Sequence, residues 1–226
     1  MQAREPISRT YRFVMAALAP VIRWWGRLEV AGAEHLPTVG PTLIVGNHDS
    51  YWDPIAIGMA GRERRQIRAL AKSTLWKFPG LAPILNGMGQ VPIERGGADT
   101  HALDRAVETL RDGGCIGVFP EGTISRGKYL RPRSGAVRLA LAVPGVQVVS
   151  CTVTGTVDIV RFPKRPRIRV EFFPPAEGGV RDGEDAAALA VRLTGEIRER
   201  APIALPGRKR TAERLRRAAE ETEASS

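Results

Sequence analysis

The stretch PTLIVGNHDSYWDP, residues 41–54, joins a short apolar run to a segment that can begin a helix. Its first half is rich in β-branched and aliphatic side chains, the composition of a buried strand. Pro54 suits the first turn of a helix, where its missing N–H group would have no intrahelical partner. The loop between them offers short polar side chains that can cap this helix, namely Asn47, Asp49 and Ser50. A strand, a polar loop and a helix in this order predict an α/β unit.

The same alternation extends in both directions. Further runs rich in Val, Ile or Phe are expected to be strands, at 27–32, 67–72, 90–94, 115–120, 146–155 and 167–173. Residues 99–114 place an apolar stripe on one helix face, with Asp99 as the expected cap and Gly113 as the expected stop. Residues 184–200 predict a closing helix. We therefore predict one layered α/β domain over residues 28–205, with a mixed central sheet flanked by helices.

Residues 1–27 are expected to form an N-terminal amphipathic, membrane-associated helical segment. The apolar run 13–22 lies between arginines, but it is much shorter than the roughly 20 residues that a spanning helix needs. Trp24 and Trp25 follow it, as in a helix that lies in the lipid headgroup layer. A helix docked on the domain core fits the pattern equally well, because periodicity does not separate the two. The opening MQAREPISRT lacks the features of a secretory signal, so we expect an intracellular protein.

The chain has a formal net charge of +10, which favours a polyanionic partner such as nucleic acid, an anionic membrane or a phosphorylated substrate. A nucleic-acid binder should gather its cations on one element and interleave them with aromatic residues. Here the cations are dispersed and the tryptophans lie in apolar or motif contexts, so we expect no nucleic-acid partner. Residues 206–226 are expected to be a basic, charged C-terminal tail.

Cysteine and histidine are scarce, which limits the chemistry that the chain can support. The two cysteines, Cys115 and Cys151, each lie in an apolar run, where cysteine behaves as a small hydrophobe. A disulfide framework is therefore not expected. The three histidines show no clustered spacing with these cysteines, so we expect no metal site.

His48 and Asp53 form the most informative pair of polar residues. Within a regular helix a separation of five positions would place them about 140° apart, out of contact. With His48 in the loop and Asp53 in the first helical turn, the carboxylate can bind one ring nitrogen, fix the tautomer and support the imidazolium. This arrangement predicts a general base. A loop histidine with a purely structural role is the alternative, since such a spacing is easily met by chance.

A second motif favours the general base over the structural histidine. FPEGT, residues 119–123, follows a predicted strand and ends in small residues whose N–H groups can turn toward an anion. Asn47, His48 and Asp53 together with FPEGT resemble two signature blocks of the glycerolipid acyltransferase family, which includes 1-acylglycerol-3-phosphate acyltransferases. GQVPIER (89–95) resembles the block that lies between these two, with Pro92 in place of phenylalanine. The resemblance covers about residues 40–155.

The resemblance implies an O-acyltransferase of phospholipid synthesis, peripheral at the cytoplasmic face of the cell membrane. Acyl-CoA or acyl carrier protein would be the donor, without a further cofactor. The acceptor would be 1-acylglycerol-3-phosphate, glycerol-3-phosphate or another lysolipid or glycolipid. His48 would deprotonate the acceptor hydroxyl and Asp53 would orient it. The residues that would bind substrate are Lys72, Arg95, Glu121, Gly122, Thr123 and Arg126. A catalytically inactive lipid-binding relative is the other possibility within this family.

Two departures from the family pattern concern the acceptor. Ile124 stands where relatives commonly carry arginine, so another cation of the following loop is expected to substitute, from Arg126, Lys128, Arg131 and Arg133. The strand around Ser150 lacks the family's proline. Lys72 fits the phosphate site or an exposed strand end equally well. The apolar segment 74–89 is expected to be either core or a membrane-facing acyl groove.

Overall fold

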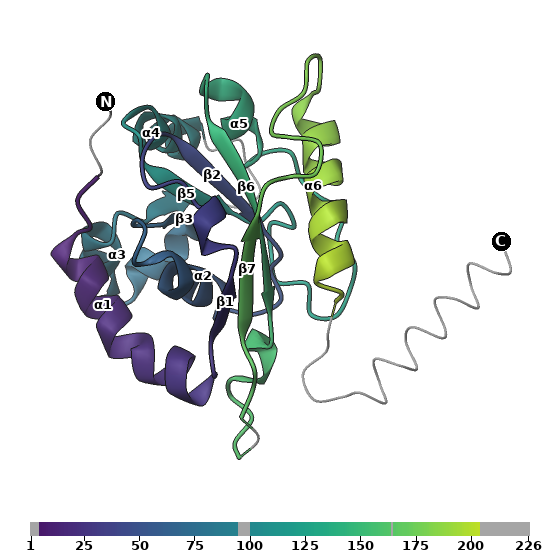
Figure 1. The fold of residues 1–226 in the computed structure, drawn as a ribbon. Helices are drawn as coiled ribbons and strands as arrows, with labels where there is room; N and C mark the ends of the chain where they lie inside the picture. Colours follow the sequence, from purple (N-terminus) through teal and green to yellow (C-terminus); the bar gives the residue numbers. More distant parts are fainter. Residues whose placement is uncertain (1–4, 95–99, 164, 204–226) are drawn as a thin grey trace, which may run out of the picture.

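A computed structural model describes residues 5–94, 100–163 and 165–203 and shows the predicted α/β fold (Figure 1). All seven predicted runs form strands of one sheet: β1 (Glu29–Ala31), β2 (Thr42–Gly46), β3 (Arg68–Lys72), β4 (Val91–Ile93), β5 (Cys115–Val118), β6 (Gln147–Thr154) and β7 (Arg169–Phe173). The helices are α1 (Arg9–Ala19), α2 (Asp53–Gly61), α3 (Leu81–Gly87), α4 (Thr100–Arg111), α5 (Arg138–Ala142) and α6 (Ala186–Arg200). Shorter helical segments are η1 (Pro20–Trp25), η2 (Ala33–His35), η3 (Ser73–Lys77) and η4 (Thr156–Asp158).

The sheet is mixed, as expected. Its strand order is β1-β7-β6-β2-β5-β3-β4, and β6 pairs with β7 in the antiparallel direction whereas the other neighbours are parallel. β6, β2 and β5 lie side by side in the centre and are parallel, so their carboxyl ends meet at one edge of the sheet. Ligand sites of open α/β sheets lie outside this edge.

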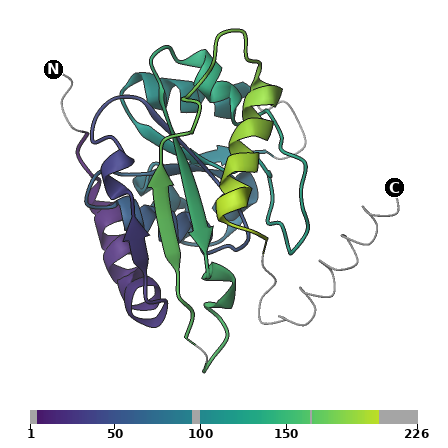
Figure 2. The ribbon, with the colours of Figure 1, turned by 45° about the vertical axis from the view of Figure 1, so that its right-hand side comes forward.

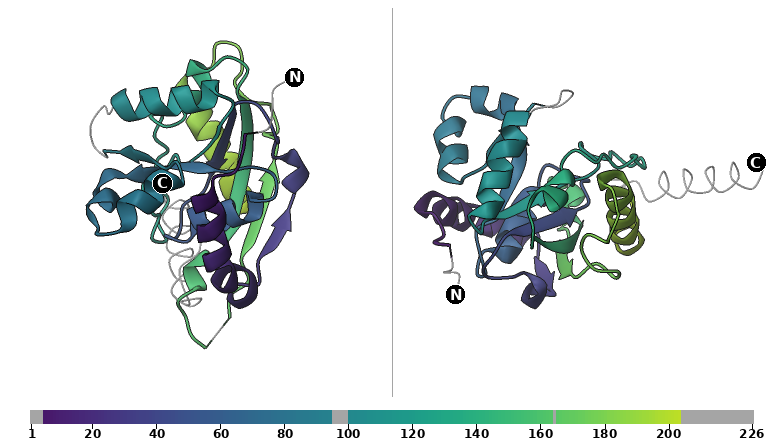
Figure 3. Two further views of the ribbon diagram at one scale, coloured as in Figure 1. Left: turned by 90° about the vertical axis from the view of Figure 1, so that its left-hand side faces the viewer. Right: turned by 90° about the horizontal axis from the view of Figure 1, so that it is seen from above.

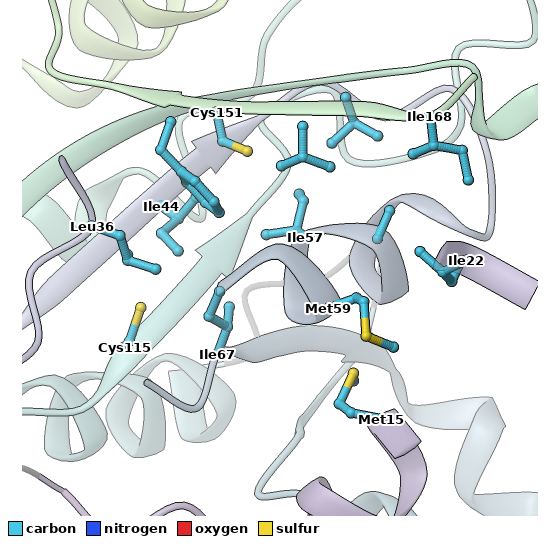
Figure 4. Close-up of a cluster of buried hydrophobic side chains, with 14 of the residues drawn as sticks. Met15, Ile22, Leu36, Ile44, Ile57, Met59, Ile67, Cys115, Cys151 and Ile168 are labelled. Carbon is cyan, nitrogen blue, oxygen red and sulfur yellow. The ribbon is translucent and has the colours of Figure 1, made fainter. Parts of the chain in front are cut away.

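Two apolar clusters cover the two faces of the sheet. Seen from above, α1 and α6 lie on opposite sides of it (Figure 3), and α6 runs along β6 and β7 (Figure 2). On the α1 face Ile44 of β2 packs with residues of α1 and α2 (Figure 4), whereas on the other face Leu43 and Val45 pack with α4, α5 and α6. Alternate residues of β2 thus enter opposite layers, which explains why this strand reads as one continuous apolar run.

The two predicted helices match α4 and α6. α4 is followed by Gly113, whose φ of 79° lies in the left-handed region that glycine tolerates. Asp185 caps α6 by accepting hydrogen bonds from two backbone N–H groups. Asp99, expected to cap α4, and the tail 206–226 lie outside the described residues.

The prediction that side chains of the 47–50 loop cap the next helix was wrong. α2 begins at Asp53 with no side-chain cap, although Pro54 does lie in its first turn. Asn47 instead exchanges hydrogen bonds with the backbone of Val153, and the side chain of Asp49 binds Arg198. The side chains of Asn47 and Asp49 therefore bind β6 and α6 instead of capping the start of α2.

The N-terminal helical segment has one buried face and one exposed face. Tyr11, Met15 and Ile22 are buried against the domain, so one face of the segment is docked on the core. The opposite face leaves Phe13 and Trp24 exposed. Within the described residues, none of the helices is both long enough and apolar enough to span a bilayer.

The apolar segment 74–89 is for the most part not core. Met88 alone of its residues belongs to a buried cluster, and Phe78 and Ile84 are exposed. The segment forms η3 and α3 directly after β3, whose carboxyl end lies at the same edge of the sheet as that of β2. Its apolar side chains are therefore available at the surface near this edge.

Candidate active site

Three strand ends bring polar residues together at the carboxyl edge of the sheet. Asn47 and His48 follow β2, Phe119 and Glu121 follow β5, and Thr156 follows β6. The strands that carry them are neighbours, so segments more than 100 residues apart in sequence meet here; Thr156, for example, binds Asp53 at a sequence separation of 103. His48 lies in the loop after β2 and Asp53 in the first turn of α2, as the sequence predicted.

His48 and Asp53 make the contact that their spacing predicted. His48 Nδ1 lies 3.1 Å from Asp53 Oδ2. The same carboxylate accepts hydrogen bonds from the N–H groups of Asp49 (2.6 Å) and Ser50 (2.7 Å), and its other oxygen accepts the Thr156 hydroxyl at 2.5 Å. Four donors fix this fully buried carboxylate. Because an ionised carboxylate only accepts hydrogen bonds, Nδ1 is the ring nitrogen that donates to Asp53, and Nε2 is the ring nitrogen that can take up a proton.

The imidazole is also fixed on its flat side. The ring of Phe119 stacks on that of His48, with centroids 4.3 Å apart and planes at 14°. The backbone of His48 donates its N–H to Glu121 Oε2 at 2.9 Å, and its carbonyl accepts the N–H of Ser125 at 2.8 Å. The two motif loops therefore form one unit, and a histidine that is 7% exposed keeps one defined orientation.

The carboxylate of Glu121 joins the loop of His48 to helix α6. Its carboxylate accepts the His48 N–H group with one oxygen and binds Arg198 through the other, at 2.6 Å from Nε. Burial raises the pKa of this carboxyl, although the charge and hydrogen bonds of Arg198 oppose the shift. Both oxygens are thus engaged inside the protein, and Glu121 shapes the site by holding the histidine loop.

Arg198 is a site residue that the sequence did not reveal. It lies near the end of α6, is 8% exposed, and binds both Asp49 and Glu121. It stands next to Ile197 in a helix with a continuous apolar stripe, and a single arginine at such a position gives no sequence signal. Its partners come from two other loops, so only the fold identifies it.

A cavity of ≈ 290 Å³ opens beside Glu121 and is lined by Glu121, Thr123, Leu130, Arg131, Pro132 and Arg133. Gly122 between the two motif residues has a φ of 69° and lies under the Arg133 side chain. Within the described part of the chain, no hydrogen bond or ion pair engages the side chains of Arg126, Lys128, Arg131 and Arg133. All four side chains are exposed, so they can meet an anion from solvent.

The remaining predicted residues are less closely joined to the pair. Lys72 ends β3 and is exposed; β3 is separated from β2 by β5, and no contact with the described residues links Lys72 to His48. Arg95 lies outside the described residues. Cys115 and Cys151 are free and buried, as expected for small hydrophobes. Burial raises the pKa of the Cys115 thiol to about 12 and that of Cys151 well above its ordinary value, so neither is a ready nucleophile.

The fold and the His48–Asp53 site together define a class of transferase. The family model described as Acyltransferase matches residues 27–154, and the chain belongs to this family.

Similar curated proteins are named 1-acyl-sn-glycerol-3-phosphate acyltransferases. The chloroplastic protein of Arabidopsis thaliana is 29% identical over 69% of this chain and 44% of its own length, and that of Borreliella burgdorferi is 29% identical over 63% and 58%. The chain thus spans about half the length of these relatives. The crystal structure of the 1-acyl-sn-glycerophosphate acyltransferase PlsC from Thermotoga maritima shares the fold, with a TM-score of 0.59 at 21% identity over 84% of this chain and 79% of that chain.

Proposed function

We propose that the protein transfers a fatty acyl group from acyl-CoA or acyl carrier protein to a hydroxyl of 1-acylglycerol-3-phosphate or a related glycerol phosphate. The observation that carries this proposal is the buried His48–Asp53 pair, in which Nδ1 lies 3.1 Å from the carboxylate. The names of the similar proteins support the choice of acceptor and reaction. Glycerol-3-phosphate itself or another lysolipid is the alternative acceptor.

In the proposed reaction, Nε2 of His48 takes the proton of the acceptor hydroxyl while the hydroxyl oxygen bonds to the thioester carbonyl carbon. The C–S bond of the resulting tetrahedral intermediate then breaks, the carbonyl re-forms, and the thiolate leaves with the proton that the imidazolium returns. Asp53 stabilises the imidazolium through the Nδ1 contact. The acyl group passes directly to the acceptor, in keeping with the burial of both cysteines.

We place the acceptor phosphate at the basic loop, residues 126–133. Its arginines reach the cavity beside Glu121 and Thr123, and the N–H group of Ser125 just before it binds the His48 carbonyl. The forked donors of arginine suit a phosphate. Arg131 and Arg133 would thereby take over the role of the family arginine that Ile124 replaces. Arg95 and Lys72 remain proposed ligands of the phosphate.

The acceptor proposal is tested by mass spectrometry of products from mixed acyl-CoAs and matched acceptors with and without phosphate. We expect acylation of the phosphorylated acceptors only. The Arg131→Gln/Arg133→Gln variant should raise the acceptor KM about tenfold or more, because each charge-assisted hydrogen bond is worth about 1.5–3 kcal/mol. Equal acylation of monoacylglycerol would refute a phosphate site. Thiol release that is independent of any acceptor would indicate a thioesterase instead.

We further propose that the protein docks peripherally on the cytoplasmic face of the membrane through an aromatic corner, defined as Trp24, Trp25, Val160 and Phe162. Trp24 is 74% and Phe162 85% exposed, and Phe162 stacks on Trp25 with centroids 5.8 Å apart. Four arginines are close neighbours of these residues in the sequence, namely Arg23, Arg27, Arg161 and Arg165. Exposed aromatic side chains among cations suit an anionic lipid surface. Val160 and Phe162 follow Thr156, which binds Asp53, so docking would place the membrane near the segment that contacts the catalytic pair.

Replacing Trp24 and Phe162 with serine is expected to weaken binding to phosphatidylglycerol vesicles by about tenfold or more, since burying one large apolar side chain contributes about 1.5–3 kcal/mol. Co-sedimentation with vesicles measures this directly. Val191→Ser, which changes an exposed apolar residue on α6, is the matched control and should bind normally. Unchanged binding of the double variant, or equal binding to neutral phosphatidylcholine vesicles, would contradict this docking surface.

A further inference from the structure

Arg198 makes an unusually complete set of contacts for a side chain with no assigned role. Its terminal nitrogens donate to the two oxygens of Asp49, each at 2.9 Å, in the forked geometry that guanidinium and carboxylate share. Its Nε donates to Glu121 at 2.6 Å, and one terminal nitrogen also donates to the carbonyl of Ala201 at 3.3 Å. The guanidinium therefore joins the end of α6 to both motif loops.

Both carboxylates that Arg198 binds belong to residues next to His48, one along the chain and one through a hydrogen bond. Asp49 is the next residue, and its N–H group is one of the four donors that hold the Asp53 carboxylate. Glu121 accepts the N–H of His48 itself. Asp49 also accepts the hydroxyl of Ser125, the residue whose N–H binds the His48 carbonyl. The N–H group of His48 is thus bound by Glu121, a partner of Arg198. Its carbonyl is bound by Ser125, which in turn binds Asp49, the other partner of Arg198.

The charges around His48 explain why a cation is needed there. Three carboxylates face this loop, from Asp49, Asp53 and Glu121, and Arg198 supplies the positive charge among the described residues that contact them. The buried thiol of Cys151 is a further titratable neighbour of Asp53. Without Arg198, the carboxylates of Asp49 and Glu121 would repel each other across the interface of the two loops.

We propose that Arg198 is a positioning residue of the acyl transfer, one that keeps the loops after β2 and β5 in register so that the His48 imidazole stays aligned with the acceptor hydroxyl. The proposal rests on the transferase function proposed above. A contribution to stability alone does not account for the arrangement, because a buried ion pair is often no more stabilising than apolar residues of similar volume. Arg198 acts on the acceptor only through His48 and is not itself a ligand of the substrate.

Two variants separate positioning from stability. Arg198→Met leaves two buried carboxylates uncompensated and is expected to lower both thermal stability and activity. The triple variant Asp49→Asn/Glu121→Gln/Arg198→Met removes that charge imbalance and should regain stability, while the amide oxygen introduced at position 121 can still accept the His48 N–H. If Arg198 positions His48, kcat of the triple variant stays about 100-fold low, the scale that a misplacement of about 1 Å can cause. The acceptor KM should change by less than about threefold, as for an interaction felt in the transition state.

Arg192→Met is the matched control. Arg192 lies on the same helix and also makes a forked pair with a carboxylate, Glu184, with contacts of 2.8 and 2.7 Å, but within the described residues it has no contact with the motif loops. Its loss should leave kcat within about twofold of the wild-type value. Recovery of kcat together with stability in the triple variant, or a rise confined to the acceptor KM, would overturn the proposal.

A spectroscopic readout makes the inference independent of turnover. The chain has three histidines, so the ring C–H cross-peak of His48 can be assigned by its loss in His48→Ala. We expect this cross-peak to shift or split in Arg198→Met and in the triple variant, and to stay in place in Arg192→Met. An unmoved peak would refute the positioning role. If the cross-peak shifts in these variants as expected but the wild-type protein transfers no acyl group, the proposed function alone would be contradicted.

Discussion

Replacing His48 with alanine is expected to lower the rate of acyl transfer by about 10²- to 10⁴-fold, the usual contribution of a general base. No other group among the described residues pairs with Asp53 in a way that could take over the proton. The fold should persist, since the backbone contacts of position 48 with Glu121 and Ser125 do not depend on the side chain. Product formation at saturating donor and acceptor measures the effect, with circular dichroism to check folding.

The matched control for this variant is His35→Ala. His35 lies in the short helical segment η2, which follows β1 and is not part of the His48–Asp53 site. It has a weak contact with Glu34 at 3.9 Å. Its replacement should leave the rate within about twofold, as for an exposed surface change. A His48→Ala protein that stays folded and keeps full activity would show that His48 is not the general base.

Replacing Asp53 with asparagine is expected to lower the rate by a similar factor of about 10²- to 10⁴-fold. Asparagine has nearly the same shape, and its carbonyl oxygen can still accept the N–H groups of Asp49 and Ser50. The Thr156 hydroxyl can rotate to accept from the new amide. The substitution therefore removes mainly the negative charge that stabilises the imidazolium when His48 takes the proton.

Thr156→Val provides the comparison for Asp53→Asn. It deletes one neutral donor to the carboxylate but keeps the charge, so the rate should fall by about tenfold at most, the value of one ordinary hydrogen bond. Steady-state rates of both variants over a range of pH values make the measurement. Equal losses in the two variants would show that geometry, and not charge, is what Asp53 supplies.

Much of the fold could be predicted from local patterns. Strand β2 is buried on both sides, and such strands read as continuous apolar runs, whereas β7 alternates buried Val170 and Phe172 with more exposed Arg169 and Glu171. The His48–Asp53 contact was predictable because both residues belong to one strand–loop–helix unit. Within such a unit, the number of residues between two side chains determines whether they can make contact.

Contacts between distant segments could not be predicted in the same way. The capping prediction for Asn47 and Asp49 was wrong because β6 and α6 compete for those side chains across 106 and 149 residues of sequence. The role of Glu121 and the presence of Arg198 in the site depend on the same long-range pairing. The N-terminal helix left two alternatives open because one of its faces is docked and the other exposed, and its composition reflects both.

The most direct measurement of the central claim is the rate of thiol release from acyl-CoA as acceptor is added, for the wild type and for His48→Ala. Direct transfer to a hydroxyl activated by His48 requires release close to zero without acceptor, a saturable rise with acceptor in the wild type, and little rise in the variant. A burst of thiol without acceptor, together with an acylated protein mass, would contradict the account.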